Sequence, residues 1–165
     1  MARARWRVVT FVALAACEPP TTSVVVDNDF GAGGPIVYAA YWENASFATP
    51  VLPGAMSSPM TTVATSAETA YVVLAEGWDP SSPSAPTSYV LLQSPGGFSV
   101  ALGDTLHIPV SDQTFDGDCA SGSHLTQQQA DFIVDYVFPS LFFGGHYDVG
   151  TCTMTLPPPA DGGAD

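Results

Sequence analysis

The second half of the chain contains two cysteines, which could form a disulfide, and two of its histidines could bind zinc together with them. Cys119 and Cys152 make an even pair there, and a bridge between them would stabilise the fold by about 3–4 kcal/mol in the chain-entropy model. With His124 and His146, the same sulfurs would instead offer two thiolates and two imidazole nitrogens, a legitimate tetrahedral zinc set. The spacing is looser than in common zinc motifs, so the sequence favours the disulfide.

An acidic segment that begins at Asp112 resembles the first half of an EF-hand calcium loop. Asp112, Thr114 and Asp116 take the first, third and fifth loop positions, a glycine takes the sixth, and Asp118 adds another carboxylate. The pattern then fails, because the twelfth position is Ser123 where a bidentate glutamate is needed. The segment therefore predicts either an acidic turn in solvent or a looser oxygen site for Ca²⁺, and no other cofactor is indicated.

Known motifs for nucleophilic or nucleotide chemistry do not occur in the sequence. There is no Gly-x-Ser-x-Gly elbow, no His-Glu-x-x-His, no Walker A sequence and no dinucleotide fingerprint. A catalytic triad whose members lie far apart in the sequence stays open, because such partners meet only in the fold. The chain is therefore more consistent with a non-catalytic module than with an enzyme.

Aromatic side chains gather in one apolar run and just after another. Tyr38, Tyr41 and Trp42 lie in the first run, and Trp78 follows the second. Strand alternation would place Tyr38 and Trp42 on one face and Tyr41 on the other. Such a set could stack on a sugar, but aromatic residues in a domain of this size mostly fill the core, which is the interpretation we favour.

The charge balance excludes one large class of partners. Asp and Glu number 16 against three basic residues, Arg3, Arg5 and Arg7, for a formal net charge of −13. A nucleic-acid-binding surface needs Lys or Arg, and none occurs after residue 7. Nucleic acid is therefore excluded as a partner of the chain beyond these arginines. With 46% hydrophobic residues, we expect the chain to bury a core rather than to be disordered as a whole.

The N-terminus has the pattern of a secretory signal peptide. The arginines precede a short apolar run, Val8 to Ala16, about half as long as the roughly 20 residues that a membrane-spanning helix needs. The run ends in Leu14-Ala15-Ala16-Cys17, which resembles the lipobox of bacterial lipoprotein precursors at all four positions. The resemblance covers only the first 17 residues, and no family is recognised for the rest of the chain.

The resemblance implies a lipid anchor. In such lipoproteins the cysteine thiol receives diacylglycerol, cleavage occurs just before it and the new amino terminus is usually acylated, so Cys17 would join the chain to membrane lipid. Asp in the next position commonly signals inner-membrane retention, so Glu18 favours the outer membrane in a Gram-negative cell. The alternative is a plain secreted protein in which Cys17 is incidental. In either case an oxidising compartment favours the disulfide over zinc.

Short apolar runs separated by Gly, Pro and Ser predict a series of strands. They are Val24–Asp27, Ile36–Glu43, Thr69–Glu76, Ser88–Gln93, Phe98–Leu102, Leu106–Val110 and Thr151–Leu156. Ser94-Pro95-Gly96-Gly97 predicts a hairpin turn between two of them, and Pro109 predicts that its strand lies at a sheet edge. Regular short strands of this kind are typical of a mainly β, β-sandwich-like domain of antiparallel strands.

One segment has helical periodicity instead. Thr126, with a glutamine three residues later, forms a capping-box pattern at its start, and Pro139 marks its end. Together they predict one helix, over about 127–138, packed on the sheets. Asp131 and Asp135 lie four residues apart on it, which indicates a solvated acidic face, with a cation site as the alternative.

Four segments follow from these features: a lipoprotein signal peptide (1–16), a lipidated tether (17–23), a single mostly β domain (24–156) and a disordered tail (157–165). We expect a lipid-anchored extracytoplasmic protein of the cell envelope that acts as a non-catalytic structural or binding module. The alternative is a divalent-cation-dependent domain that binds carbohydrate (a glycan) or another envelope protein. An extracytoplasmic hydrolase is the third hypothesis.

Overall fold

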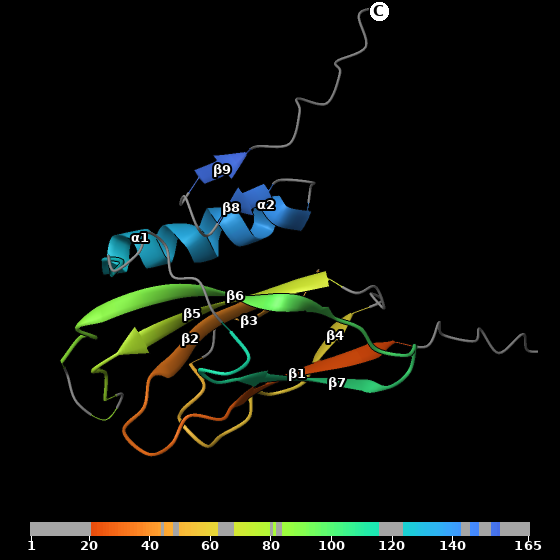
Figure 1. Ribbon diagram of the computed structural model, residues 1–165, viewed down its shortest axis with the longest axis horizontal. Helices are drawn as coiled ribbons and strands as arrows, with labels where there is room; N and C mark the ends of the chain where they lie inside the picture. The colour runs from red at the N-terminus through yellow and green to blue at the C-terminus, as the bar shows by residue number, and fades with distance from the viewer. Residues whose placement is uncertain are drawn as a thin grey trace, which may run out of the picture.

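In the computed structural model, the protein consists of two packed β-sheets with a helical layer on one side (Figure 1). The prediction of a mainly β, sandwich-like fold with one helical region in the C-terminal half is therefore confirmed. The described residues are 21–43, 45–47, 50–62, 68–79, 81, 84–115, 124–142, 146–148 and 153–155.

Two sheets of unequal width form the sandwich. The three-stranded sheet has the order β4-β1-β7, with β4 (Met60–Thr62), β1 (Thr22–Asn28) and β7 (Thr105–Val110). The four-stranded sheet has the order β3-β2-β5-β6, with β3 (Ala45–Phe47), β2 (Ile36–Trp42), β5 (Glu68–Glu76) and β6 (Ser88–Phe98). Pairing within the four-stranded sheet is antiparallel, whereas β1 and β7 are parallel. The strand that carries Pro109 lies at a sheet edge, as predicted.

The helical layer covers the outer face of the four-stranded sheet (Figure 1). It consists of α1 (Gln127–Phe132), the π-helical turn η1 (Ile133–Val137) and α2 (Phe138–Phe142), and the short hairpin of β8 (His146–Asp148) and β9 (Thr153–Thr155) follows. The predicted capping box is confirmed, because the Gln129 N–H donates to Thr126 Oγ1 at 3.3 Å and the Thr126 N–H donates to Gln129 Oε1 at 2.9 Å.

Two apolar cores lie on opposite faces of β5. Its even-numbered residues Ala70, Val72 and Leu74 pack toward the three-stranded sheet. Its odd-numbered residues, such as Val73 and Ala75, pack under the helix. A strand that is buried on both faces needs apolar residues at every position, which explains the uninterrupted run in the middle of β5.

The predicted hairpin turn at residues 94–97 is wrong, and so is a separate strand over Phe98–Leu102. β6 continues through this segment to Phe98, and the extra residues form a bulge opposite Ala70. The Ala70 N–H donates to Ser94 Oγ at 3.0 Å, and the Ser94 hydroxyl donates to the Gly96 carbonyl at 2.6 Å. A buried serine side chain thus takes the place of a backbone partner. The residue types Ser, Pro and Gly are common both in such bulges and in hairpin turns, so the sequence alone does not distinguish the two.

The predicted end of the helix before Pro139 is also wrong, because helical structure continues to Phe142. The N–H of Phe138 donates to the carbonyl of Ile133, five residues back, so the bonding pattern shifts by one residue immediately before the proline. This wider turn opens the backbone where a proline ring would otherwise meet the carbonyl four residues earlier. The π-helical turn therefore lets the helix pass through a residue that normally ends one.

The first strand begins slightly earlier than the sequence pattern indicates. β1 starts at Thr22, whose side chain is fully buried, rather than at Val24. β1 therefore begins five residues after Cys17, which itself lies outside the described residues. None of the described helices is both long and apolar enough to cross a membrane.

Candidate functional site

The unequal width of the two sheets leaves part of β6 without an opposing strand. β3 contacts β4 and β1 contacts β2 across the sandwich, so the sheets are aligned at that edge and β6 extends past β7. At one end of β6, Phe98 stacks on Phe115 with ring centroids 6.3 Å apart and fills the space below the strand. At the other end, near Ser88, an open groove of about 630 Å³ remains.

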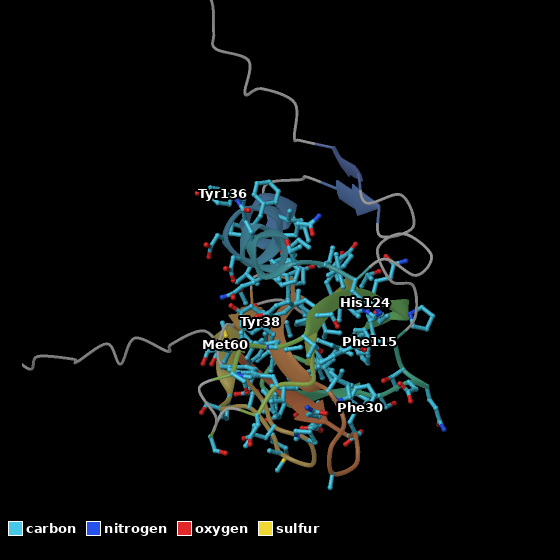
Figure 2. All side chains as sticks on the ribbon, turned by 90° about the vertical axis from the view of Figure 1, so that its left-hand side faces the viewer. Phe30, Tyr38, Met60, Phe115, His124 and Tyr136 are labelled. Carbon is cyan, nitrogen blue, oxygen red and sulfur yellow. The ribbon has the colours of Figure 1, made fainter. Side chains whose placement is uncertain are left out.

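The floor of the groove is apolar. It is formed by Leu74 of β5 and by Val90 and Leu92 of β6, which point toward the sandwich interior but stay only half-buried on the edge strand. Phe30 forms one wall, and Figure 2 shows it along the same side of the molecule as Phe115 and His124.

A buried asparagine fixes the loop that carries Phe30. Asn28 Nδ2 donates to the carbonyls of Pro35 and Val51 at 3.1 and 2.8 Å, and its Oδ1 accepts the Phe30 N–H at 3.2 Å. Asn28 is 1% exposed, so its side chain cannot form hydrogen bonds with solvent, and these bonds to the protein take their place. The groove wall is therefore set by the core rather than by a free loop.

The rim of the groove brings together a serine, a carboxylate and a histidine that lie far apart in the sequence. His124 Nδ1 lies 3.2 Å from Glu76 Oε2, and the Ser88 hydroxyl donates to the same oxygen at 2.6 Å. The side chains of His124 and Glu76 are 54% and 41% exposed, so solvent reaches both. No local motif links these three residues, and the sequence analysis missed them as a group.

The order of these contacts differs from that of a catalytic triad. A triad needs the serine hydroxyl on the histidine nitrogen that the carboxylate does not touch. Here Ser88 donates to Glu76 instead, and no residue of the described part of the chain forms a hydrogen bond with His124 Nε2. The arrangement orients the imidazole but does not activate a nucleophile.

The predicted calcium segment is only partly described. Asp112 is exposed and lies on the rim of the groove. Thr114 is used by the turn itself, because its Oγ1 accepts the Ser111 N–H at 2.9 Å and donates to the Pro109 carbonyl at 2.7 Å. Asp116 and Asp118 lie outside the described residues, so the Ca²⁺ site stays a prediction.

The predicted cysteine sites are not described either. Cys119 and Cys152 lie outside the described residues, and only the backbone of His146 lies within them. The disulfide, the zinc alternative and lipidation of Cys17 therefore stay predictions. Within the described ranges, no group of three His, Cys, Asp or Glu side chains could hold a metal ion.

A second polar contact joins the four-stranded sheet to the helix, at Tyr38, which Figure 2 shows below the helical layer. The Tyr38 hydroxyl donates to Asp131 Oδ1 at 2.8 Å beside a cavity of about 150 Å³ that Asp135 also lines. Burial, followed by the hydrogen bond and charge of Asp131, raises the pKa of Tyr38 to about 12. The carboxylate of Asp131 is thus hydrogen-bonded to the sheet, whereas the sequence favoured a solvated face for Asp131 and Asp135.

A β-bulge overturns the predicted placement of the aromatic residues. The pairing of β2 with β5 shifts between Val37 and Ala39, so Tyr38 turns toward the helix and packs edge-on to Tyr89 at 5.1 Å. Trp42 instead lies fully buried between the two sheets, and its indole N–H donates to the Glu68 carbonyl at 3.1 Å. The two rings lie on opposite faces and form no common stacking platform, although core packing of Trp42 is confirmed.

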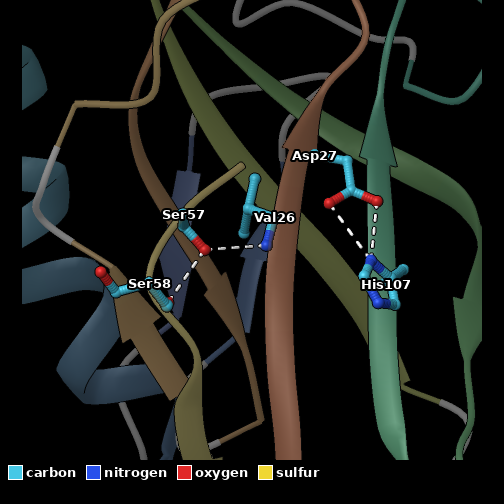
Figure 3. A network of polar contacts seen from close by, with 5 residues as sticks. All are labelled: Val26, Asp27, Ser57, Ser58 and His107. Carbon is cyan, nitrogen blue, oxygen red and sulfur yellow. Dashed lines mark hydrogen bonds and ion pairs between the residues drawn. The ribbon is translucent and has the colours of Figure 1, made fainter. Parts of the chain in front are cut away.

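A further contact between polar side chains lies on the outer face of the three-stranded sheet. His107 Nδ1 lies 2.9 Å from Asp27 Oδ2 across the parallel pair (Figure 3), and the histidine side chain is 53% exposed. On the other side of β1, the Val26 N–H donates to Ser57 Oγ at 3.0 Å (Figure 3). None of these residues lines the groove or the cavity under the helix.

Comparison with known proteins assigns no family, because no protein-family model, no curated protein and no solved structure matches the chain.

Proposed function

We propose that this chain is a lipid-anchored protein of the bacterial cell envelope whose β domain is a non-catalytic binding module. The observation that carries the proposal is the open groove, in which a half-buried apolar floor meets a charged rim. Pockets of this size with a few convergent polar groups are the usual sites of ligand binding. The rim lacks the serine–histidine contact that acyl transfer would need.

The position of the groove relative to the chain start supports a tethered binder. From Cys17 to Thr22 the chain spans five residues, which extend to at most about 18 Å. β1 then runs for seven residues, about 23 Å, from its Thr22 end to Asn28 beside the groove wall. An anchor at Cys17 would hold the Thr22 end near the membrane and turn the groove away from it.

The anchor is tested by expressing the full chain in a bacterial host that is fed an alkyne fatty acid. Wild-type protein is expected in the membrane fraction with the label attached, and Cys17→Ala is expected to lose both properties. Cys119→Ala serves as the matched control, because it removes a thiol outside the lipobox. Equal labelling of wild type and Cys17→Ala, or labelling of neither, would remove the anchor from the proposal.

A serine hydrolase is the second candidate, and the meeting of Ser88, Glu76 and His124 is the observation that favours it. It requires the Ser88 hydroxyl to leave Glu76 and turn to the histidine. A fluorophosphonate probe distinguishes the two functions, since it labels an activated serine. Labelling that is lost in both Ser88→Ala and His124→Ala, and kept in Ser99→Ala, would establish the hydrolase and refute the non-catalytic module.

A further inference from the structure

We propose that the groove binds a peptide segment in which a lysine or arginine is flanked by apolar residues. The inference deepens the proposed function and rests on it, since it names the partner chemistry of the same groove.

The floor indicates the apolar part of this partner. Val90 and Leu92 lie on the inner face of β6, yet each stays partly exposed because no described strand lies opposite. Removing such apolar surface from water is favourable by about 25 cal/mol per Å². A volume of about 630 Å³ exceeds what one side chain fills and suits a short stretch of peptide.

The rim indicates the charge. Glu76 and Asp112 face the groove, and the only basic side chain among its lining residues is His124. Both described contacts of the Glu76 carboxylate go to Oε2, and within the described ranges neither Oε1 nor the Asp112 carboxylate has a hydrogen-bond partner. These oxygens are therefore available to an ammonium or guanidinium group from another molecule.

The composition makes an external cation the natural complement. No Lys or Arg occurs after Arg7, so the part of the chain that follows residue 7 offers no side-chain counter-charge to Glu76 or Asp112 other than a histidine. The remaining acidic residues add a field that draws cations to the surface and repels phosphates. Nucleic acid and anionic lipid are disfavoured for the same reason, and a metal ion has no cluster of three ligands in the described part of the chain.

The test measures binding of the peptide acetyl-Leu-Arg-Leu-amide to the full chain in neutral detergent at low ionic strength by isothermal titration calorimetry. The probe is compared with acetyl-Leu-Glu-Leu-amide, which reverses the charge, and with pentalysine, which carries more positive charge but lacks the apolar flanks. We expect the arginine peptide to bind best and the glutamate peptide not to bind.

Two rim variants locate the site. Asp112→Asn and Glu76→Gln are each expected to weaken binding by about two- to fivefold, as for partly exposed ion pairs. Asp104→Asn is the matched control, because this exposed acid precedes β7 at the end of the sheet opposite the groove. Asp112 has no described contact, so its variant stays informative if Glu76→Gln, which loses contacts to His124 and Ser88, fails to fold.

Three outcomes would overturn the inference: no binding of the arginine peptide, equal binding of pentalysine, or equal weakening by Asp104→Asn. The last two would indicate general charge attraction rather than a site. Failure here leaves the fatty-acid labelling of Cys17 unaffected, so the partner and the anchor are judged separately.

Discussion

The Ser94 hydroxyl takes the place of a strand partner inside the four-stranded sheet. It accepts the Ala70 N–H and donates to the Gly96 carbonyl, and the residue is 4% exposed. The Ala70 N–H therefore depends on this one side chain, because Ala70 is 1% exposed and water does not reach it.

Ser94→Ala is expected to destabilise the fold by about 1–3 kcal/mol, the cost of leaving a buried donor without a partner. The measurement is the free energy of unfolding in urea, with Ser99→Ala, an exposed serine in the following loop, as the control. A change no larger than that of the control would show that the bulge rearranges to satisfy Ala70 by another route.

The buried tyrosines predict a loss of stability in alkali. Burial is the largest cause that raises the pKa of both Tyr38 and Tyr41 from 10.0 to about 12. A raised folded-state pKa means that the unfolded chain deprotonates first, so stability is full below pH 10.0 and falls as pH rises toward about 12.

Absorbance of tyrosinate follows this titration directly. In folded protein, we expect Tyr38 and Tyr41 to ionise well above the unfolded value, and burial also raises the pKa of Tyr71 and Tyr89. We expect Tyr41→Phe to make the alkaline loss of unfolding free energy shallower. Tyr41 is the better variant, since it is 7% exposed and forms no described hydrogen bond, whereas Tyr38→Phe also loses the bond to Asp131. Ionisation of every tyrosine near the ordinary pKa of about 10 would contradict the burial argument.

Among single residues, the sequence predicted those whose role depends on close neighbours. Spacing singled out Asp112 as a candidate calcium ligand, which stays a prediction, and the structure places the residue on the groove rim. Glu76 and Ser88 were not singled out, and His124 was considered only as a zinc ligand. The three come from different elements, and only the packing of β5, β6 and the segment before α1 brings them together. A pattern of period two or 3.6 contains no information on such contacts.

At the scale of elements, the helix start was predictable and its end was not. Thr126 and Gln129 satisfy each other locally, so the capping box needs no tertiary contact. The end depends on the π-helical turn before Pro139, and Ile133, Val137 and Phe138 of this region are buried against the four-stranded sheet. Packing thus sustains a helix that local rules would end.

The capping box gives a test of how much the helix depends on its own start. Thr126→Ala should lower the free energy of unfolding by about 1 kcal/mol, since it removes the acceptor of the Gln129 N–H. Gln127→Ala, at an exposed position of the first turn, is the control and is expected to change little. A loss near zero for Thr126→Ala would mean that packing alone holds this end of the helix.

The cysteine prediction concerns a disulfide that would join Cys119, before α1, to Cys152, which directly precedes β9 in the sequence. If Cys119 and Cys152 are joined in an exported full chain, the intact mass is lower by two hydrogen atoms than that of the thiol form, and Cys119→Ala abolishes the difference. A protein with both thiols and one bound zinc would contradict the disulfide and direct attention to Cys119, His124, His146 and Cys152.

At the scale of the whole molecule, the layer order explains which parts of the fold the sequence could give. β2 and β5 are apolar on both faces because one face meets the three-stranded sheet and the other meets the helix. The long runs were therefore found, whereas the three-residue strands β3, β4 and β8 are too short to show a period. The parallel pairing of β1 with β7 joins strands far apart in the chain and has no local signal.

The charge of the whole molecule predicts that salt stabilises it. With a formal net charge of −13 and no Lys or Arg after Arg7, the folded state holds its carboxylates close together with few counter-charges, and dissolved ions screen their repulsion. The melting temperature of the full chain is therefore expected to rise with NaCl concentration, and the chlorides of other monovalent cations should act alike. A melting temperature that does not change with NaCl would mean that the carboxylates are too far apart to repel.

Calcium separates screening from a specific site. At equal ionic strength, CaCl₂ should raise the melting temperature no more than NaCl if Ca²⁺ only screens. An additional rise that follows the calcium concentration would reveal a bound ion, since a ligand that binds only the folded state stabilises it by mass action. Loss of that rise in Asp112→Asn, and not in Asp104→Asn, would locate the ion at the segment that begins with Asp112. The groove rim would then be assigned to binding a metal cation rather than a peptide.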